Sequence, residues 1–398
     1  MDPYRNPYTP GAGSLPLELA GREPEIDACR VMLGRLERGM PDRPLAIHGL
    51  RGIGKTVLVR QLADEARQRG WVVIHRELRS AARLRPILAR ALDVALRELE
   101  PEKKFRQMIE RLRSVLASFT ASVDPSGAIR LSVDVEPTRG IADSGELEGD
   151  TVDLLVEVGT VAREEGRGLL LALDELHELD RAGLEALTAA LHQTTQMELP
   201  VALLCAGLPH LPGRLIEAKT YAERLYKFPR LTALSDEASR DALIVPAERE
   251  EVEFEEKAIE AIVSKSEGYP YFLQEWGRAV WNAAEQSPIT LADVELAAPR
   301  VQDELDEEFF AVRLEKAPPT ERLYLAAMAE LGDGPQRTAD IADELGRTPQ
   351  QLSTARGLLI DRGLIYREDH GTVAFTVPNY ADFMRRRWPL SSLLGETG

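Results

Sequence analysis

The feature that most constrains this chain is the stretch G-L-R-G-I-G-K-T at residues 49–56. Two glycines, a lysine and a hydroxyl stand there at the spacing of a phosphate-binding P-loop. Glycine lets backbone N–H groups turn inward onto phosphate oxygens. Lys55 is expected to reach the β- and γ-phosphates, and the Thr56 hydroxyl is expected to bind Mg²⁺. The stretch therefore predicts a site for the phosphates of a nucleotide.

The residues around this stretch predict the strand and the helix that such a loop requires. Residues 44–48 form a short apolar run, and apolar residues share one face of a helix over 57–69. Gly70 stands where a helix C-cap glycine belongs. The N-terminus of the helix adds a partial positive charge for phosphate. The predicted phosphate-binding residues are Gly49, Leu50, Arg51, Gly52, Ile53, Gly54, Lys55, Thr56 and Val57.

Composition limits the partners and the compartment. The length of 398 residues predicts two to three domains, and the net charge of -17 argues against a general nucleic-acid coat or a binder of anionic membranes. A small local DNA-binding face stays compatible with that charge. The two cysteines, Cys29 and Cys205, lie far apart and fit a reducing cytoplasm. The N-terminus lacks a signal-peptide core, and no apolar run is long enough to cross a bilayer, so we expect a cytoplasmic protein without a membrane partner.

Apolar runs that alternate with helical patterns predict an α/β fold with a parallel sheet covered on both faces. Turn residues at 122–127 followed by alternating apolar residues also predict a β-hairpin insertion near 119–135, which we interpret as a plain surface feature. The predicted strands are residues 44–48, 71–76, 168–173, 200–206 and a shorter 225–228.

An acidic pair follows one of these runs. Asp174 and Glu175 come directly after L-L-L-A-L, which is the apolar-strand-then-acid pattern called Walker B. Asp174 is expected to help hold Mg²⁺ beside Thr56, and Glu175 to orient or deprotonate the attacking water. We expect both at the carboxyl end of a strand next to the P-loop strand, where open α/β sheets bind ligands. The pair extends the prediction from phosphate binding to hydrolysis.

With these motifs the chain resembles the AAA+ and STAND branch of P-loop ATPases. Two further pieces carry the resemblance. G-R-E-P-E at residues 21–25 is similar to the N-terminal signature that lines the adenine pocket, and G-Y-P at 268–270 is similar to the G-x-P element that lies against the nucleotide. The resemblance implies that Arg22, Gly268 and Pro270 help bind ATP. It also implies self-association in the ATP state.

Two departures from the family pattern predict slow hydrolysis or a nucleotide-gated switch. Tyr271 stands where a sensor 2 arginine usually follows the G-x-P element. The strand that ends at Cys205-Ala206-Gly207 carries no Asn, Ser or Thr for sensor 1. His210 is a substitute there, or else a structural residue.

Three other side chains have open roles. Arg224, with Arg230 as second choice, is the predicted arginine finger that reaches a neighbour's γ-phosphate; a surface salt-bridge arginine is an equal alternative. His177, in D-E-L-H-E-L, is interpreted as a helix-start residue that faces solvent.

The C-terminal residues predict a helix, a helix-turn-helix and a two-stranded wing, which resembles a winged-helix domain. Thr348-Pro349-Gln350-Gln351 reads as a capping-box start of the third helix. Acids and bases roughly balance here, so both a DNA partner and a protein partner stay open. The residues placed to contact DNA are Gln350, Ser353, Thr354, Arg356 and the cluster Arg385, Arg386 and Arg387.

The predicted organisation is a flexible N-terminus over 1–16, a P-loop ATPase α/β domain over 17–234, a helical lid over 235–314 and a winged-helix domain over 315–390. The leading hypothesis is an AAA+/STAND-like ATPase in which slow Mg-ATP hydrolysis drives a switch that repositions the winged helix. The alternative is an ATP-responsive DNA-binding regulator in which hydrolysis is incidental.

Overall fold

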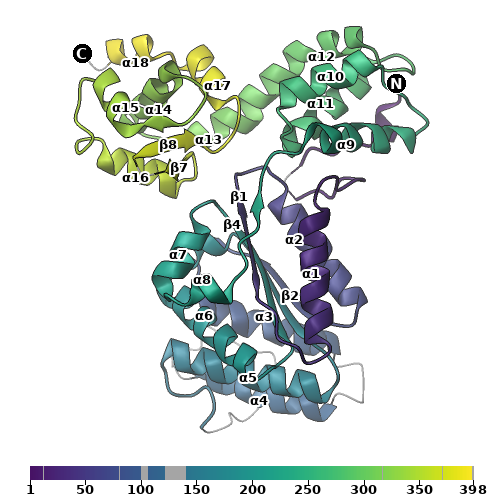
Figure 1. The fold of residues 1–398 in the computed structure, drawn as a ribbon, viewed down its shortest axis with the longest axis vertical. Helices are drawn as coiled ribbons and strands as arrows, with labels where there is room; N and C mark the ends of the chain where they lie inside the picture. The colour runs from purple at the N-terminus through teal and green to yellow at the C-terminus, as the bar shows by residue number, and fades with distance from the viewer. Residues whose placement is uncertain are drawn as a thin grey trace. The chain divides into compact units, whose positions relative to one another are not determined.

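The computed structural model describes residues 1–11, 13–79, 81–99, 106–121, 140–315, 317–369 and 371–396. The chain divides into two compact units, whose elements are labelled in Figure 1. The sheet unit comprises Arg22–Gly49 and Lys55–Leu231. The helical unit comprises Met1–Gly21, Leu50–Gly54 and Thr232–Gly398. Of the hairpin predicted near 119–135, residues 122–135 lie outside the described residues, and the first three belong to helix α4.

The sheet unit is built on a parallel sheet, as the apolar runs predict. Its five described strands are ordered β2-β3-β4-β1-β5, and every neighbouring pair is parallel. Strands β3 and β4 are buried along their whole length, which explains their unbroken apolar sequences. The strands are β1 (Leu45–Gly49), β2 (Val72–Glu77), β3 (Leu169–Asp174), β4 (Val201–Gly207) and β5 (Arg230–Leu231).

The order of the strands corrects one expectation. The strand that ends in Asp174 is not next to the P-loop strand, because β4 pairs with β1 on one side and with β3 on the other. All three strands run parallel, so their carboxyl ends still meet at one edge of the sheet. The end of β4 therefore lies between the P-loop strand and the acidic pair.

The strand predicted over 225–228 forms only in part, because Lys227 makes an isolated parallel bridge with Leu45 of β1 but no regular strand forms there. Leu225 ends a short helix, α8 (Ala222–Leu225), in which Ala222 and Leu225 are buried. The edge strand forms later, at β5, where Arg230 and Leu231 pair with the end of β1.

Helices cover both faces of this sheet (Figure 1). Helices α1 and α2 pack on one face, and α3, α5, α6 and α7 contact the strands from the other, where a large apolar core forms. The helices are α1 (Glu23–Leu36), α2 (Lys55–Gln68), α3 (Leu84–Leu99), α4 (Arg106–Ala121), α5 (Leu147–Glu164), α6 (Arg181–Gln196) and α7 (Leu211–Ala218).

Four helices follow Thr232 in the helical unit, within the residues 235–314 that were predicted to be helical. The last of them continues without a break into a π-helical turn, η4 (Leu305–Ala311), and then α13 (Val312–Leu314). The four helices are α9 (Asp236–Glu248), α10 (Glu256–Ser266), α11 (Pro270–Ala283) and α12 (Leu291–Glu304).

Part of the N-terminal segment that the sequence predicts to be flexible packs within the helical unit. Tyr8 is buried, and its hydroxyl donates a hydrogen bond to the carbonyl of Leu243 on α9. Its ring lies edge-on to Trp281, and a Cβ on Gly277 would meet it at 2.6 Å. Burial of an aromatic ring against a glycine on α11 holds this segment in place.

The remaining elements of the helical unit follow the predicted order of helices and a hairpin. Strand β8 pairs antiparallel with β7 and with the short β6, which the sequence did not predict. The regular helix α16 begins at Ser353, five residues after the predicted start at Thr348. Thr348 and Gln351 exchange the hydrogen bonds expected of a capping box, but the residues between them form a turn and not the first turn of the helix. The elements are α14 (Pro319–Leu331), β6 (Gln336–Arg337), α15 (Thr338–Glu344), α16 (Ser353–Asp361), β7 (Ile365–Asp369), β8 (Thr372–Phe375), α17 (Tyr380–Arg387) and α18 (Leu390–Glu396).

Among the described residues, no helix combines the length and the apolar character needed to cross a membrane.

Candidate active site

The P-loop has the backbone that its glycines allow. It joins β1 to α2, and α2 begins at Lys55. Gly52 and Gly54 have φ of +77° and +95°, in the left-handed region that favours glycine. Lys55 is only 4% exposed, and its ammonium donates to the carbonyl of Gly49 at 3.0 Å. The lysine side chain thus lies back toward the end of β1.

The acidic pair stands at the carboxyl end of β3. Asp174 is 1% exposed, and its Oδ1 accepts the backbone N–H of Glu175 at 2.8 Å. Its Oδ2 is buried without a hydrogen-bond partner among the described residues. Glu175 has φ of +53°, an uncommon conformation for a residue with a side chain, and such conformations cluster at functional sites.

The geometry at Asp174 fits a divalent cation. A buried carboxylate oxygen without a partner is costly unless a ligand or an ion satisfies it. No group of three or more His, Cys, Asp or Glu side chains able to hold a metal occurs in the described part of the chain. Mg²⁺ binds proteins through one or two oxygens and completes its shell with phosphates and water. Thr56, half-buried at the start of α2, is the second oxygen ligand that we expect.

His177 corrects a further expectation, because it does not face solvent. It is 3% exposed in a short 3₁₀-helix, η3 (Leu176–Glu178). Its Nδ1 lies 3.2 Å from Oε2 of Glu175, and its ring meets the ring of His210 edge-on at 5.3 Å between centroids. The D-E-x-H spacing was the only sequence signal, and it does not say whether the ring is buried.

Arg22, predicted to line the adenine pocket, is buried as the residue before α1. Burial lowers the pKa of its guanidinium, while the nearby Glu25 and Glu23 act in the opposite direction. Arg224 and Arg230 are both exposed. Arg224 makes no ion pair with another described residue.

In the helical unit, the G-x-P element has a backbone conformation that favours glycine at its first position. Gly268 has φ of +67°, and Pro270 starts α11. Between them, the buried Tyr269 lies against the P-loop: a Cβ on Gly52 would meet its ring at 2.8 Å. Tyr271, at the sensor 2 position, stacks on Phe309 at 4.7 Å between ring centroids. It therefore packs as an aromatic residue and supplies no positive charge.

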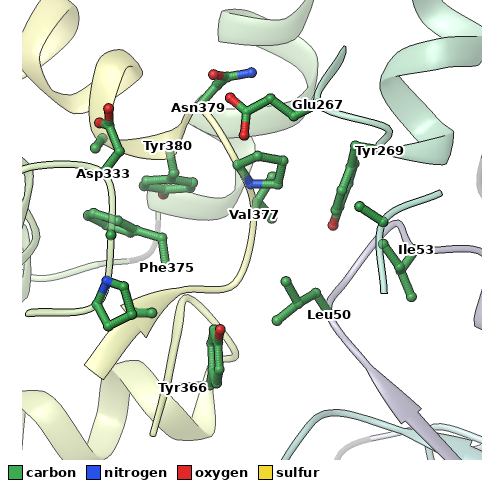
Figure 2. Close-up of a pocket in the computed structure, with 16 residues that line it drawn as sticks. Leu50, Ile53, Glu267, Tyr269, Asp333, Tyr366, Phe375, Val377, Asn379 and Tyr380 are labelled. Atoms are coloured by element: carbon green, nitrogen blue, oxygen red, sulfur yellow. The ribbon is translucent and has the colours of Figure 1, made fainter. Parts of the chain in front are cut away.

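A cavity of about 270 Å³ lies beside the P-loop residues of this unit (Figure 2). Leu50 and Ile53 form one wall, and Tyr269 adjoins them. The opposite wall comes from the C-terminal elements and includes Tyr366 and Phe375, with Tyr380 beside them. P-loop side chains and the β7–β8 hairpin therefore share one cavity.

A series of aromatic rings runs through the helical unit, and the sequence did not predict it. Tyr269 contacts Phe272 at 5.0 Å, and Phe272 contacts Phe310 at 6.0 Å between centroids. Phe310 then meets Tyr380 at 5.4 Å, and Tyr380 stacks on Phe375 of β8 at 5.3 Å. We call these five residues the aromatic series. It leads from the ring that touches Gly52 to the C-terminal sheet.

The predicted DNA-contacting residues are only partly available. Gln350, Ser353 and Thr354 are exposed, and Arg356 is half-buried. The arginine cluster at the end of α17 is engaged within the chain. Arg385 pairs with Asp333 and Asp382, Arg386 with Asp306, and Arg387 with Asp306 and Glu307.

Comparison with known proteins gives two family matches. Residues 18–204 match the model described as AAA ATPase domain, and residues 307–384 match a domain of unknown function, DUF8462. No curated protein matches the chain.

Among solved structures, the Walker-type ATPase PABY2304 of Pyrococcus abyssi is similar, with a TM-score of 0.58 and 18% identity over 92% of this chain and 96% of that one. Cdc6p of Pyrobaculum aerophilum has a TM-score of 0.46 and 14% identity over 100% and 99% of the two chains. The ORC1 protein of Aeropyrum pernix, solved in complex with DNA, has a TM-score of 0.45 and 18% identity over 95% of each. The likeness to PABY2304 shows a shared fold.

Proposed function

We propose that this chain, an AAA-type P-loop ATPase with its AAA ATPase domain at residues 18–204, is a slow Mg-ATPase whose nucleotide state repositions its C-terminal residues. The observation that carries the proposal is the aromatic series, together with the contact of Tyr269 with Gly52. The packed rings connect the P-loop with residues 315–390, so a change at the P-loop can be transmitted to those residues. We propose a winged helix for those residues.

The binding roles follow from the positions of the residues. Backbone N–H groups of the P-loop and the N-terminus of α2 would hold the β- and γ-phosphates, with the Lys55 ammonium as the neutralising charge. Thr56 and Asp174 would hold Mg²⁺, which offsets the charge that develops on the phosphate oxygens during transfer. Arg22, Gly268 and Pro270 complete the proposed ATP-binding set.

Hydrolysis needs a base beside the attacking water. The water oxygen forms a bond to the γ-phosphorus, and the bond from that phosphorus to the β–γ bridging oxygen breaks, with its electron pair leaving on ADP. Glu175 takes the proton that the water loses. Tyr271, which follows the G-x-P element directly, packs on Phe309, and Arg313 of the helical unit lies over the same Phe309 ring. The lack of an arginine at position 271 itself is our reason for proposing slow turnover.

Hydrogen exchange tests the switch directly. We would compare amide exchange of residues 365–375 with ADP and with a non-hydrolysable ATP analogue, in the wild-type chain and in Tyr269→Leu. Exchange in the hairpin is expected to differ between the two nucleotides in the wild type, and the difference should vanish in Tyr269→Leu while ATP still binds. Identical exchange with both nucleotides in a wild-type chain that binds both would refute the switch.

Self-association is the other proposed consequence of ATP binding. Arg224 is exposed at the end of α8 and makes no ion pair within the described ranges, so it is free to reach a neighbour's γ-phosphate. Light scattering should then report a larger mass with the ATP analogue than with ADP, and Arg224→Ala should lose that increase. The proposed compartment is the cytoplasm, where buried free thiols such as Cys29 and Cys205 are usual.

An ATP-responsive DNA-binding regulator is the competing function. The exposed Gln350, Ser353 and Thr354 favour it, but the ion pairs of the arginine cluster oppose it, since paired arginines are not free for phosphates. Duplex binding that weakens with salt and disappears in Arg356→Glu would support this function over the first. Fluorescence anisotropy with a labelled duplex gives the measurement.

A further inference from the structure

The buried imidazole of His177 touches the carboxylate proposed to activate water. Its Nδ1 is 3.2 Å from Oε2 of Glu175, and its Nε2 is 3.5 Å from Oε1 of Glu178. We infer that His177 is a positioning residue that orients the Glu175 carboxylate for hydrolysis. The inference rests on the proposed role of Glu175.

The end of β4 sets the position of this ring. Gly207, the last residue of β4, leaves room for it: a Cβ there would lie 3.2 Å from Nδ1. The backbone N–H of Leu208 points at the same nitrogen from 3.4 Å. The ring of His210 closes another side. A ring held by backbone and by packing on several sides can define where a neighbouring carboxylate lies.

In this structure Nδ1 accepts the N–H of Leu208 at 3.4 Å, and Oε2 of Glu175 lies 3.2 Å from the same nitrogen. Donation from Nδ1 to the Glu175 carboxylate requires the other tautomer, because one ring nitrogen cannot donate and accept at once. His177 therefore links the orientation of Glu175 to the end of β4, the strand between the P-loop strand and β3. The sequence places no Asn, Ser or Thr at this strand end, and His177 reaches it from η3.

Steady-state phosphate release separates positioning from a structural role. We would compare the wild type with two variants. His177→Leu fills much of the space of the ring but has no polar nitrogen, and His177→Asn has an amide N–H near the position of Nδ1. His177→Leu is expected to lower kcat about 10-fold or more with KM within about 2-fold, because the phosphate-binding loop is untouched. His177→Asn should recover most of kcat. An unchanged kcat in His177→Leu, or an equal loss in both variants, would overturn the inference.

A double-mutant cycle with Glu175→Gln makes the test specific. If His177 acts through Glu175, adding His177→Leu to Glu175→Gln should lower the residual rate by less than about 2-fold. A further 10-fold loss in the double variant would mean that His177 acts elsewhere and would reject the inference. Wild-type turnover by Glu175→Gln would overturn the proposed role of Glu175 and this inference with it. Loss of turnover in Glu175→Gln but not in His177→Leu would overturn this inference alone.

Discussion

The backbone of Gly268 lies so close to Leu234 that a Cβ on Gly268 would meet the carbonyl oxygen of Leu234 at 2.4 Å. The two residues are also bonded, since the N–H of Leu234 donates to the carbonyl of Gly268 at 2.8 Å. Gly268 has a φ of +67°, so both its conformation and its surroundings require glycine. Within the helical unit, this contact ties the loop before α9 to the start of α11.

Gly268→Ala is therefore expected to destabilise the helical unit strongly. The left-handed backbone alone costs a residue with a Cβ about 1–2 kcal/mol, and overpacking adds about 1–3 kcal/mol. Gly346→Ala is a matched control, because Gly346 has φ of +59° but no atom lies within 4 Å of the place a Cβ would take. Denaturant unfolding should show a loss for Gly268→Ala at least about 1 kcal/mol larger than for the control. Equal losses in the free energy of unfolding would mean that the close contact with Leu234 does not contribute to the effect of Gly268→Ala.

One variant in the P-loop and one in the acidic pair should separate ATP binding from turnover. Lys55→Ala removes the ammonium expected on the β- and γ-phosphates, so ATP affinity should fall to an undetectable level in a calorimetric titration. Glu175→Gln keeps the shape of the side chain but removes its basicity, so it should bind ATP normally and release phosphate at least about 100-fold more slowly. A full-affinity titration in Lys55→Ala would disprove the site. Undiminished phosphate release in Glu175→Gln would disprove its role.

The buried ion pair between Arg85 and Asp150 should be a main determinant of stability in the sheet unit. The two groups are 2.8 Å apart and almost fully buried, and Asp150 also accepts hydrogen bonds from Ser144. Asp150→Ala leaves the Arg85 charge buried without its partner, so unfolding should become easier by about 3–5 kcal/mol. The exposed pair of Lys219 with Glu148 is the comparison: Glu148→Ala should cost less than about 1 kcal/mol. Similar losses in both variants would contradict this account.

The stability of the folded chain should fall as the pH drops through the range in which histidine titrates, and His75 should contribute to that fall. Burial, followed by the charge of Arg67, holds the pKa of His75 below its ordinary value in the folded chain. The unfolded chain then binds more protons than the folded one as the pH falls through about 6.5, so acid favours unfolding. His75→Gln should show a smaller drop in Tm between about pH 7.5 and about pH 5.5 than the wild type. His192→Gln controls for the loss of a histidine, and a drop in His75→Gln as large as that of the wild type would reject the assignment.

The sequence predicted most of the sheet unit because its signals are local. The glycine spacing of the P-loop dictates a loop between a strand and a helix, and an unbroken apolar run such as residues 169–173 indicates a strand buried on both faces. The G-x-P element at 268–270 was likewise found from three neighbouring residues, although the left-handed backbone of Gly268 was not predicted. These predictions depend on neighbours within a few residues.

Only the tertiary structure decided what depends on residues far apart in the chain. Strand order placed β4 between β1 and β3, and His177 is buried beside Gly207 of β4, where a Cβ would crowd its ring. The aromatic series likewise joins Tyr269 to Phe375 through residues of several helices. Sequence alone determined the nucleotide-binding motifs and their local backbone, because spacing and glycine act locally. Which groups meet the carboxylate of Glu175 was decided by packing, because contacts across a sheet are not encoded in any short stretch.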